Sequence, residues 1–436
     1  MSEASGGEDW RGVGVGASAW FDAPSLTAGA ALVGRIAELA GGTGLPDVDL
    51  RPSGVRVRIG ASGAADLNDA DLTDADLGEA DVALARAISR AARELGLAAD
   101  PSALQTVQLA IDAADTPSVM SFWRTTLAYE PVGDDALVDP LRRDPAFSFH
   151  PLDQPRPLRN RIHVDVSRAP NAVDAVKATV GQEAYGAYQL TLADAEGNEV
   201  DLVPGGELSK ETADWRTMFG AMTFYPTAPP SQASELATTV AGLADDAGLP
   251  MLVDLRPDGV TIDSGKDEWE DDEGAAESRF VDLASRIQTA AREMGLAADP
   301  TRLRFVQLGI DALDVPAVRA FWTTVLGYQH DRRPFLADIH DPRRLNPVII
   351  FQQLDPADEE RRRQRNRIRF DISVPYDQLE ARINAALAAG GRIVTDETPG
   401  EQRDQHHELK RGRRCTLTDP EGNELDLVSS PASGHI

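Results

Sequence analysis

The chain has 436 residues, and its content of 42% hydrophobic and 26% charged residues predicts a folded protein of two to four domains. Its formal net charge of −28 argues against nucleic-acid binding, which needs a basic surface. A single cysteine, Cys415, excludes intrachain disulfides and thiolate zinc clusters. The acidic N-terminus and the lack of a long apolar run predict a cytoplasmic protein with neither a signal peptide nor a membrane span.

The first hundred residues predict a helix, a hairpin and a second helix. The first helix is expected over residues 28–40, and the strand "VRVRI" over residues 55–59 follows the turn signal Pro52-Ser53-Gly54. The second helix is expected to stop at Gly96. Both helices carry apolar residues at helical spacing: Ala31, Leu32, Ile36 and Leu39 in the first, and Leu77, Leu84, Ile88 and Leu95 in the second.

Four acidic pentads occupy residues 64–84, between the hairpin and the second helix. Four pentads make about one coil, whereas a solenoid needs roughly three stacked repeats to bury a core. The spacing of a calcium-binding loop is also absent. We interpret the segment as an acidic lead-in to the second helix, because Asp and Glu stabilise a first turn through the helix dipole.

A strand-rich unit is expected after the short linker "GLAADP". The segments "TVQLAID", "NRIHVDV" and "NEVDLV" alternate apolar and polar residues as strands do, and a short helix is expected over residues 117–127.

The whole pattern then recurs, which indicates a tandem duplication. "VDLRPSGV" at residue 48 returns as "VDLRPDGV" at 253, "AARELGLAADP" at 91 as "AAREMGLAADP" at 290, and "EGNEVDLV" at 196 as "EGNELDLV" at 421. The second copy lacks the pentads, which is a further reason to regard them as dispensable. We expect four domains, at residues 1–102, 103–206, 207–302 and 303–430.

The first half of each copy resembles pterin-4a-carbinolamine dehydratase, through "ALVGRIAELA", "LPDVDLRPSGVRVRI" and "LGEADVALARAI". That family carries a His-His-Pro motif where this chain has Gly44-Leu45-Pro46 and Gly248-Leu249-Pro250. Neither half contains a histidine, the residue best suited to moving protons near neutral pH. The seven histidines of the chain all lie elsewhere: His150, His163, His330, His340, His406, His407 and His435.

The second half of each copy resembles the glyoxalase-like, actinobacterial branch of the vicinal-oxygen-chelate superfamily, which includes bleomycin-resistance proteins. The matching residues are "VQLAIDAADTPSVMSFWRTTLAY", "NRIHVDV" and "DAEGNEVDLV" with their second-copy counterparts. The two resemblances together imply an α+β fold with pseudo-twofold symmetry. Each copy would combine a dehydratase-like layer of helices and antiparallel sheet with a paired βαβββ cup.

The superfamily resemblance implies metal ligands on strands that line the cup. Strand alternation places Gln108, His163 and Asp201 opposite the apolar face, at the family's ligand positions. Each side chain is a legitimate ligand for a divalent metal. His163 and Asp201 are therefore the candidate catalytic residues of the first copy, and a metal-free pocket lined by the same polar residues is the alternative.

The second copy keeps Gln307 and Asp426 but has Arg369 where the first has His163. A guanidinium repels a cation and suits a carboxylate or phosphate, so this cup is expected to bind an anionic ligand or to hold an internal Arg369–Asp426 or Arg369–Asp371 pair. His406 and His407 are further candidate ligand-binding residues that either close over this pocket or lie on an exposed loop.

Three functions follow from these expectations. The first is a small-molecule-binding protein, or an enzyme of lyase or isomerase type, that acts in the cups without a cofactor or with a divalent metal in the first copy. The alternatives are a pterin-4a-carbinolamine dehydratase and a non-catalytic sequestering or resistance protein. The expected partner is a small molecule rather than nucleic acid or membrane, and the chain is expected to be a monomer by internal duplication or a homodimer.

Overall fold

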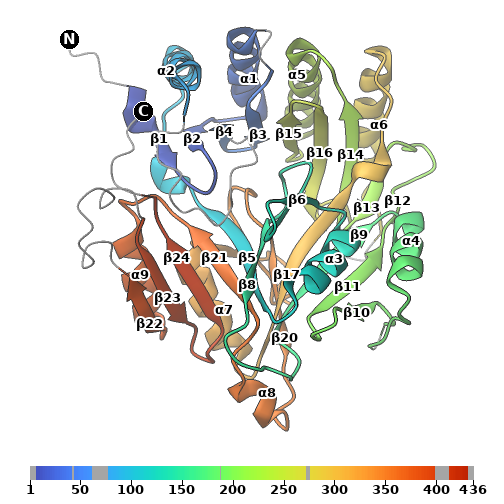
Figure 1. The fold of residues 1–436 in the computed structure, drawn as a ribbon. Coiled ribbons are helices and arrows are strands. Elements are labelled where there is room, and N and C mark those ends of the chain that lie inside the picture. The colour runs from blue at the N-terminus through green and yellow to red at the C-terminus, as the bar shows by residue number, and fades with distance from the viewer. Residues whose placement is uncertain are drawn as a thin grey trace.

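The computed structural model describes residues 6–41, 44–60, 77–186, 188–271, 275–397 and 412–430. Helices lie in one row above a large sheet, and two further sheets lie below it (Figure 1). The mixed α and β class is confirmed. Within the described ranges, no helix combines the length and apolar character needed to cross a membrane.

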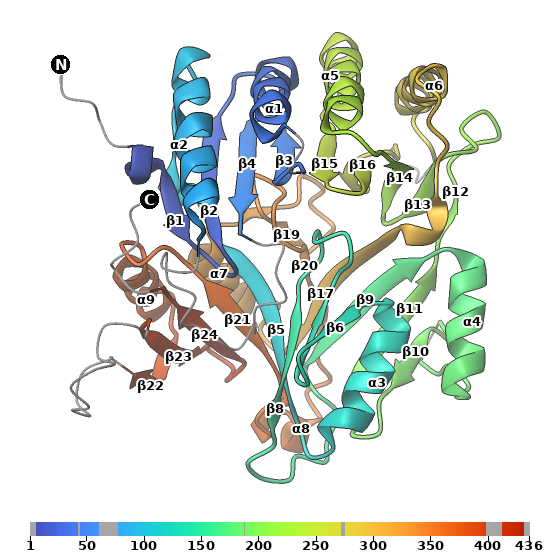
Figure 2. The same ribbon diagram turned by 45° about the horizontal axis from the view of Figure 1, so that its top comes forward.

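The large sheet has nine strands, and every neighbouring pair in it is antiparallel. Its strands, in spatial order, are β1 (Trp10–Gly12), β2 (Ala17–Asp22), β4 (Gly54–Ile59), β3 (Asp47–Arg51), β15 (Leu252–Arg256), β16 (Gly259–Lys266), β14 (Gly220–Pro226), β13 (Arg216–Met218) and β12 (Gly206–Glu207). Four helices cover one face: α2 (Glu79–Glu94), α1 (Leu26–Ala40), α5 (Pro230–Ala247) and α6 (Ser278–Glu293) (Figure 2).

The sequence predicts the positions of α1 and α2 well, but the last apolar residue of each predicted helix face is exposed rather than buried. Ile36 and Ile88 are fully buried, whereas Leu39 and Leu95 are 39% and 41% exposed. Leu39 lies in the last turn of α1 and Leu95 caps α2, where each helix runs past the sheet. The pentads fall mostly on residues 61–76, outside the described residues, and α2 begins at Glu79.

The second sheet has seven strands and combines both sequence copies. Its order is β10 (Thr191–Ala193), β11 (Glu199–Pro204), β9 (Ile162–Arg168), β17 (Arg304–Ala312), β20 (Ile349–Gln353), β19 (Ile339–His340) and β18 (Gln329–His330). The central pair β9–β17 is antiparallel and joins the first copy to the second.

The third sheet has eight strands and makes the reciprocal combination. Its order is β22 (Arg392–Glu397), β23 (Arg414–Thr418), β24 (Glu424–Val428), β21 (Ile368–Ser373), β5 (Thr106–Ala113), β8 (Phe147–Pro151), β7 (Ala136–Val138) and β6 (Glu130–Val132). The remaining helices are α3 (Thr116–Leu127), α4 (Pro170–Val180), α7 (Val315–Leu326), α8 (Glu359–Arg363) and α9 (Leu379–Ala388), with short 3-10 turns at Gly6–Asp9, Pro101–Ala103 and Pro300–Arg302. The first strand of each copy thus pairs with the later strands of the other copy.

The repeated "EGNE" motif holds this exchanged arrangement together. The Arg161 Nε atom donates to Asn423 across the copies at 2.9 Å, and the Arg367 Nε atom donates to Asn198 at the same distance. Both arginines are 1% exposed. Each asparagine of the motif therefore receives a buried arginine from the other copy, which gives the motif a structural role.

A row of buried ion pairs joins the two copies at the centre of the nine-stranded sheet. Asp49 on β3 lies directly opposite Asp254 on β15. The Arg256 Nη2 atom donates to Asp49 at 2.7 Å, and the Arg51 Nη2 atom donates to Asp254 at 2.6 Å. Two like charges opposite each other destabilise a sheet, so the arginines are essential here. Although desolvation opposes ionisation, the guanidinium of Arg256 holds the pKa of Asp49 well below its usual range.

Substitution of Arg256 tests how much this row of buried ion pairs contributes to the free energy of unfolding. Arg256→Met leaves Asp49 buried with one fewer cation and is expected to lower the free energy of unfolding by about 3–5 kcal/mol, measured by urea denaturation. Arg292→Met is the control, because Arg292 forms an exposed pair with Asp214 and exposed pairs contribute less than about 1 kcal/mol. Equal effects of the two substitutions would contradict a central role for the row.

The same carboxylates predict an acid limit to stability. Because the pKa of Asp49 is lower in the folded chain than in the unfolded one, its stabilising contribution is complete above about pH 4 and is lost as the pH falls through the folded value. We expect the free energy of unfolding to decline below about pH 4, and the decline to be smaller in Asp49→Asn. An unchanged pH profile in that variant would contradict the assignment.

Candidate functional site

Polar side chains from three strands meet inside the seven-stranded sheet. His163 and Asp165 lie on β9 and Asp201 on β11, and one ligand atom from each lies within 4.8 Å of the others. They share a face because alternate residues of a strand point the same way, and β11 pairs with β9 in a register that sets Asp201 beside Asp165. Gln307 on β17 pairs with Asp165 across the copies and donates to it at 2.9 Å.

Three buried atoms of this group have no hydrogen-bond partner: His163 Nδ1, Asp165 Oδ1 and Gln307 Oε1. Buried polar atoms without partners are costly, and each calls for an explanation. Burial raises the pKa of Asp165, even though His163 and the Gln307 amide oppose that shift. The group therefore offers buried polar atoms that a bound ligand could contact.

The remaining contacts fix the orientation of the group. The Thr191 hydroxyl donates to Asp201 Oδ1 at 2.6 Å, and the His163 Nε2 atom lies 3.5 Å from Asp165 Oδ1. On the other side of the ring, His163 Nδ1 lies 3.9 Å from Asp311 Oδ1. The Asp311 carboxylate itself is held by Arg361.

Gln108 does not join His163 and Asp201, which corrects the expected ligand set. Gln108 lies on β5 in the eight-stranded sheet, opposite Asp371, and the homologous Gln307 takes its place beside Asp165. Strand alternation correctly assigns the face on which each residue lies. It carries no information about which copy supplies the neighbouring strand, so the two glutamines are assigned to the wrong cups.

Arg369 is the centre of the corresponding cluster in the eight-stranded sheet. Its Nε atom lies 3.1 Å from Asp426, and its guanidinium also pairs with Asp112. Arg414 donates to the same Asp426 oxygen at 2.6 Å. The internal Arg369–Asp426 pair is therefore present. These contacts occupy the carboxylates that a cation would need, and they neutralise the charge that an anion would need.

Two predicted site residues cannot be placed. His406 and His407 fall within residues 398–411, outside the described residues.

Gly309 is a site residue that the sequence did not single out. It lies directly opposite His163, and a Cβ atom there would lie 2.2 Å from the imidazole Nε2 and Cε1 atoms. In the eight-stranded sheet, Ala110 lies opposite Arg369 in the same way. The difference between "VQLAIDA" and "VQLGIDA" in the two copies was the available signal.

Comparison with known proteins identifies the strand-rich halves. The family model described as "Glyoxalase-like domain" matches residues 108–203 and 307–428, which together make up half of the chain. No curated protein matches the chain.

Solved structures resemble the chain only distantly. A glyoxalase I mutant from Zea mays is 10% identical, with 76% of this chain and 95% of that chain covered at a TM-score of 0.35. The fosfomycin resistance protein FosX from Listeria monocytogenes, in a mutant form complexed with Mn(II) and a dihydroxypropylphosphonic acid, is 11% identical, with 29% and 90% covered at a TM-score of 0.22. A glyoxalase/bleomycin resistance protein/dioxygenase family enzyme from Burkholderia phytofirmans is 22% identical, with 28% and 94% covered at 0.21.

The contact between Gly309 and His163 is testable by a double-mutant cycle. Gly309→Ala is expected to lower the free energy of unfolding by about 1–3 kcal/mol, because the added methyl displaces the imidazole. In a His163→Ala background the same substitution is expected to cost little. Ala110→Gly is the matched control in the other sheet. An equal cost of Gly309→Ala in both backgrounds would show that the methyl clashes with something other than the ring.

Proposed function

The chain belongs to the glyoxalase-like family, and we propose that it binds a small molecule in the cup around His163, with a divalent metal ion as cofactor. The observation that supports this proposal best is the close approach of His163, Asp165 and Asp201, each with one ligand atom within 4.8 Å of the others, together with the buried Asp165 Oδ1 atom that has no hydrogen-bond partner. The proposed chemistry is of lyase or isomerase type, and ligand binding without turnover is the alternative for the same site.

The donor set fits a divalent metal. Nitrogen and oxygen ligands bind such ions at about 2.0–2.2 Å, so ligands of one ion lie at most about 4.4 Å apart. The atoms of His163, Asp165 and Asp201 lie within 4.8 Å of one another, so small side-chain rotations suffice. Imidazole and carboxylate ligands suit zinc, manganese and iron rather than a soft metal. Gln307 Oε1 is a fourth potential ligand from the other copy.

A metal bound here would polarise an oxygen of the substrate as a Lewis acid. The protein's own residues would position that oxygen and hold the site in shape. Thr191 fixes the Asp201 carboxylate, and Gln307 fixes the Asp165 carboxylate. The His163 imidazole has an Nδ1 atom without a hydrogen-bond partner and is a suitable acceptor for a substrate proton. Asp201 lies beside it, held by Thr191, so we assign the catalytic role to His163 and Asp201.

The cup around Arg369 is proposed to be structural. Its arginine is paired with Asp112 and Asp426, so an anionic ligand would have to displace existing ion pairs. Binding of an anion there is the competing proposal, and Arg369→Ala would abolish it. The same substitution should leave the His163 site unaffected.

We further propose that the nine-stranded sheet and its four helices form the two dehydratase-like domains, residues 1–102 and 207–302, related by a pseudo-twofold axis between β3 and β15. The glyoxalase-like domains would then be residues 103–206 and 303–430. In this proposal the dehydratase-like layer is a scaffold, because Asp47, the acid nearest the former motif, is paired with Arg142. Addition of a pterin carbinolamine should give only the uncatalysed rate of dehydration.

Metal binding is the direct test of the proposed function. Protein stripped with a chelator and titrated with Zn²⁺ or Mn²⁺ in a calorimeter is expected to bind one ion per chain. His163→Ala is expected to lose this binding, and Asp201→Asn is expected to weaken it at least tenfold, the scale of a lost ligand. His150→Ala is the matched control, since His150 is a partly buried imidazole in the eight-stranded sheet. Unaltered binding in His163→Ala would refute the site.

A further inference from the structure

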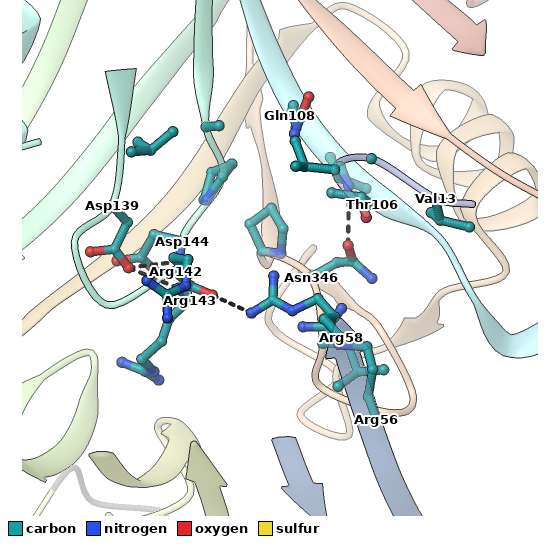
Figure 3. Close-up of a pocket in the computed structure, with 18 of the residues that line it drawn as sticks. Val13, Arg56, Arg58, Thr106, Gln108, Asp139, Arg142, Arg143, Asp144 and Asn346 are labelled. Atoms are coloured by element: carbon teal, nitrogen blue, oxygen red, sulfur yellow. Dashed lines mark hydrogen bonds between the residues drawn. The ribbon is translucent and has the colours of Figure 1, made fainter. Parts of the chain in front are cut away.

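A separate cavity lies between the nine-stranded and eight-stranded sheets (Figure 3). Its volume is about 150 Å³, and it is bounded by β4, the start of β5, and two loops at residues 139–146 and 341–348. The β4 wall and the segment around Val13 lie outside the residues that the family model covers. The lining contains none of His163, Asp165 and Asp201, so the cavity is distinct from the cup around His163, whereas Gln108 of β5 does contribute to the lining.

The body of the cavity is apolar. Its apolar lining residues include Val13, Val132, Val138, Leu345 and Pro347, which come from four segments of the chain. An apolar cavity of about this size holds a molecule as large as benzene. Size and lining together favour a compact hydrocarbon body of about six to eight carbon atoms.

One end of the cavity carries unsatisfied polar groups. Arg58 reaches from β4 toward the loop that carries Asp144 (Figure 3). Both Arg58 Nε and Asp144 Oδ2 are buried and lack a hydrogen-bond partner. The Arg58 guanidinium is otherwise held 2.8 Å from the Arg142 carbonyl oxygen and 3.3 Å from Asp47.

The other three arginines that line the cavity are already paired. The Nε atom of Arg56 lies 2.6 Å from Asp49. Arg142 pairs with Asp47 at 2.6 Å, and Arg143 pairs with Asp263 at 2.7 Å. Arg58 shares Asp47 with Arg142 at a longer distance, and burial with the nearby Arg56 lowers the pKa of Arg58 to about 10. Among the described residues of this cavity, Arg58 therefore has no carboxylate of its own.

Asp144 does not supply a negative charge at neutral pH. Burial, with the neighbouring Asp139, raises the pKa of Asp144 to about 8, so the group is a neutral carboxylic acid at pH 7 and can donate a hydrogen bond. The charged groups that act on Asp144 are Asp139, Asp263, Arg143 and Arg304. The backbone N–H of Asp144 donates to Asp139 at 3.1 Å, which fixes its loop.

We propose that this cavity binds a small monocarboxylate with a compact apolar body, whose carboxylate lies between the unpartnered polar atoms of Arg58 and Asp144. The valines, Leu345 and Pro347 would enclose the apolar part. The second copy has Thr261 and Asp263 where the first has Arg56 and Arg58, and Asn346 where the first has Asp144. Among the described residues, the second copy therefore has no counterpart of the Arg58 and Asp144 pair.

Benzoate is a suitable probe, with benzylamine as its cationic counterpart. Calorimetric titration of the full chain is expected to show one benzoate site and no benzylamine binding. Arg58→Leu is expected to lose benzoate affinity tenfold or more, the scale of a charge-assisted hydrogen bond. Val138→Phe fills the cavity without removing a polar group and is expected to abolish binding. The exposed Arg363 supplies the control Arg363→Leu.

The pH dependence tests the role of Asp144. Because the protonated acid is the hydrogen-bond donor, affinity for benzoate is expected to be constant from pH 6 to 7 and to be about tenfold weaker at pH 9. Asp144→Asn keeps a donor, so it is expected to retain affinity at pH 7 and to remove the decline. Asp134→Asn, on an exposed turn nearby, is expected to change neither.

Unchanged benzoate binding in Val138→Phe would overturn the proposal, and so would tighter binding of benzylamine than of benzoate. Removal of metal by a chelator and the His163→Ala substitution are both expected to leave benzoate binding unchanged. If His163→Ala abolishes benzoate binding, the ligand occupies the metal cup and this proposal is wrong. Failure of metal binding alone would refute the proposed function and leave this inference standing.

Discussion

The fold depends on two buried carboxylates that face each other across the seam between the copies. Asp49 and Asp254 are directly opposed on β3 and β15, and each is neutralised by an arginine from the other copy. This exchange of charges joins two sheet halves into one nine-stranded sheet. Arg143, on a loop of the strand-rich half, pairs with Asp254 as well. The same carboxylates therefore hold the sheet together and anchor the layer beneath it.

A second exchange, of strands rather than charges, builds the lower layer. Each first strand pairs with the other copy's later strands, and each buried arginine of the "NRI" segments donates to the other copy's "EGNE" asparagine. Helices nevertheless stay with their own copy: Trp123 of α3 donates to Asp194, and Trp322 of α7 donates to Asp419. The strand pairs β9–β17 and β5–β21 therefore join different copies, whereas the hydrogen bonds of α3 and α7 stay within one copy. Each of the two strand-rich sheets needs both copies.

Much of this arrangement was readable from the sequence. Periodicity located the helices, and strand alternation placed His163 and Asp201 on one polar face, where the structure brings them together. The assignment of Gln108 to this group was wrong, because partner choice between homologous strands depends on tertiary packing, and Gln108 and Gln307 have nearly identical neighbours in sequence. The cavity beside Arg58 could not be foreseen for a similar reason, since its walls come from segments more than three hundred residues apart.

The fit of Gly309 beneath His163 bears on how this chain diverged. A histidine in the first copy requires a glycine in the second, whereas Arg369 in the second is accommodated by Ala110 in the first. At these two positions, the residues that must fit each other belong to different copies. A comparison that aligns each repeat only with itself will miss these pairs. Each cup is built from strands of one repeat together with the complementary strands of the other repeat.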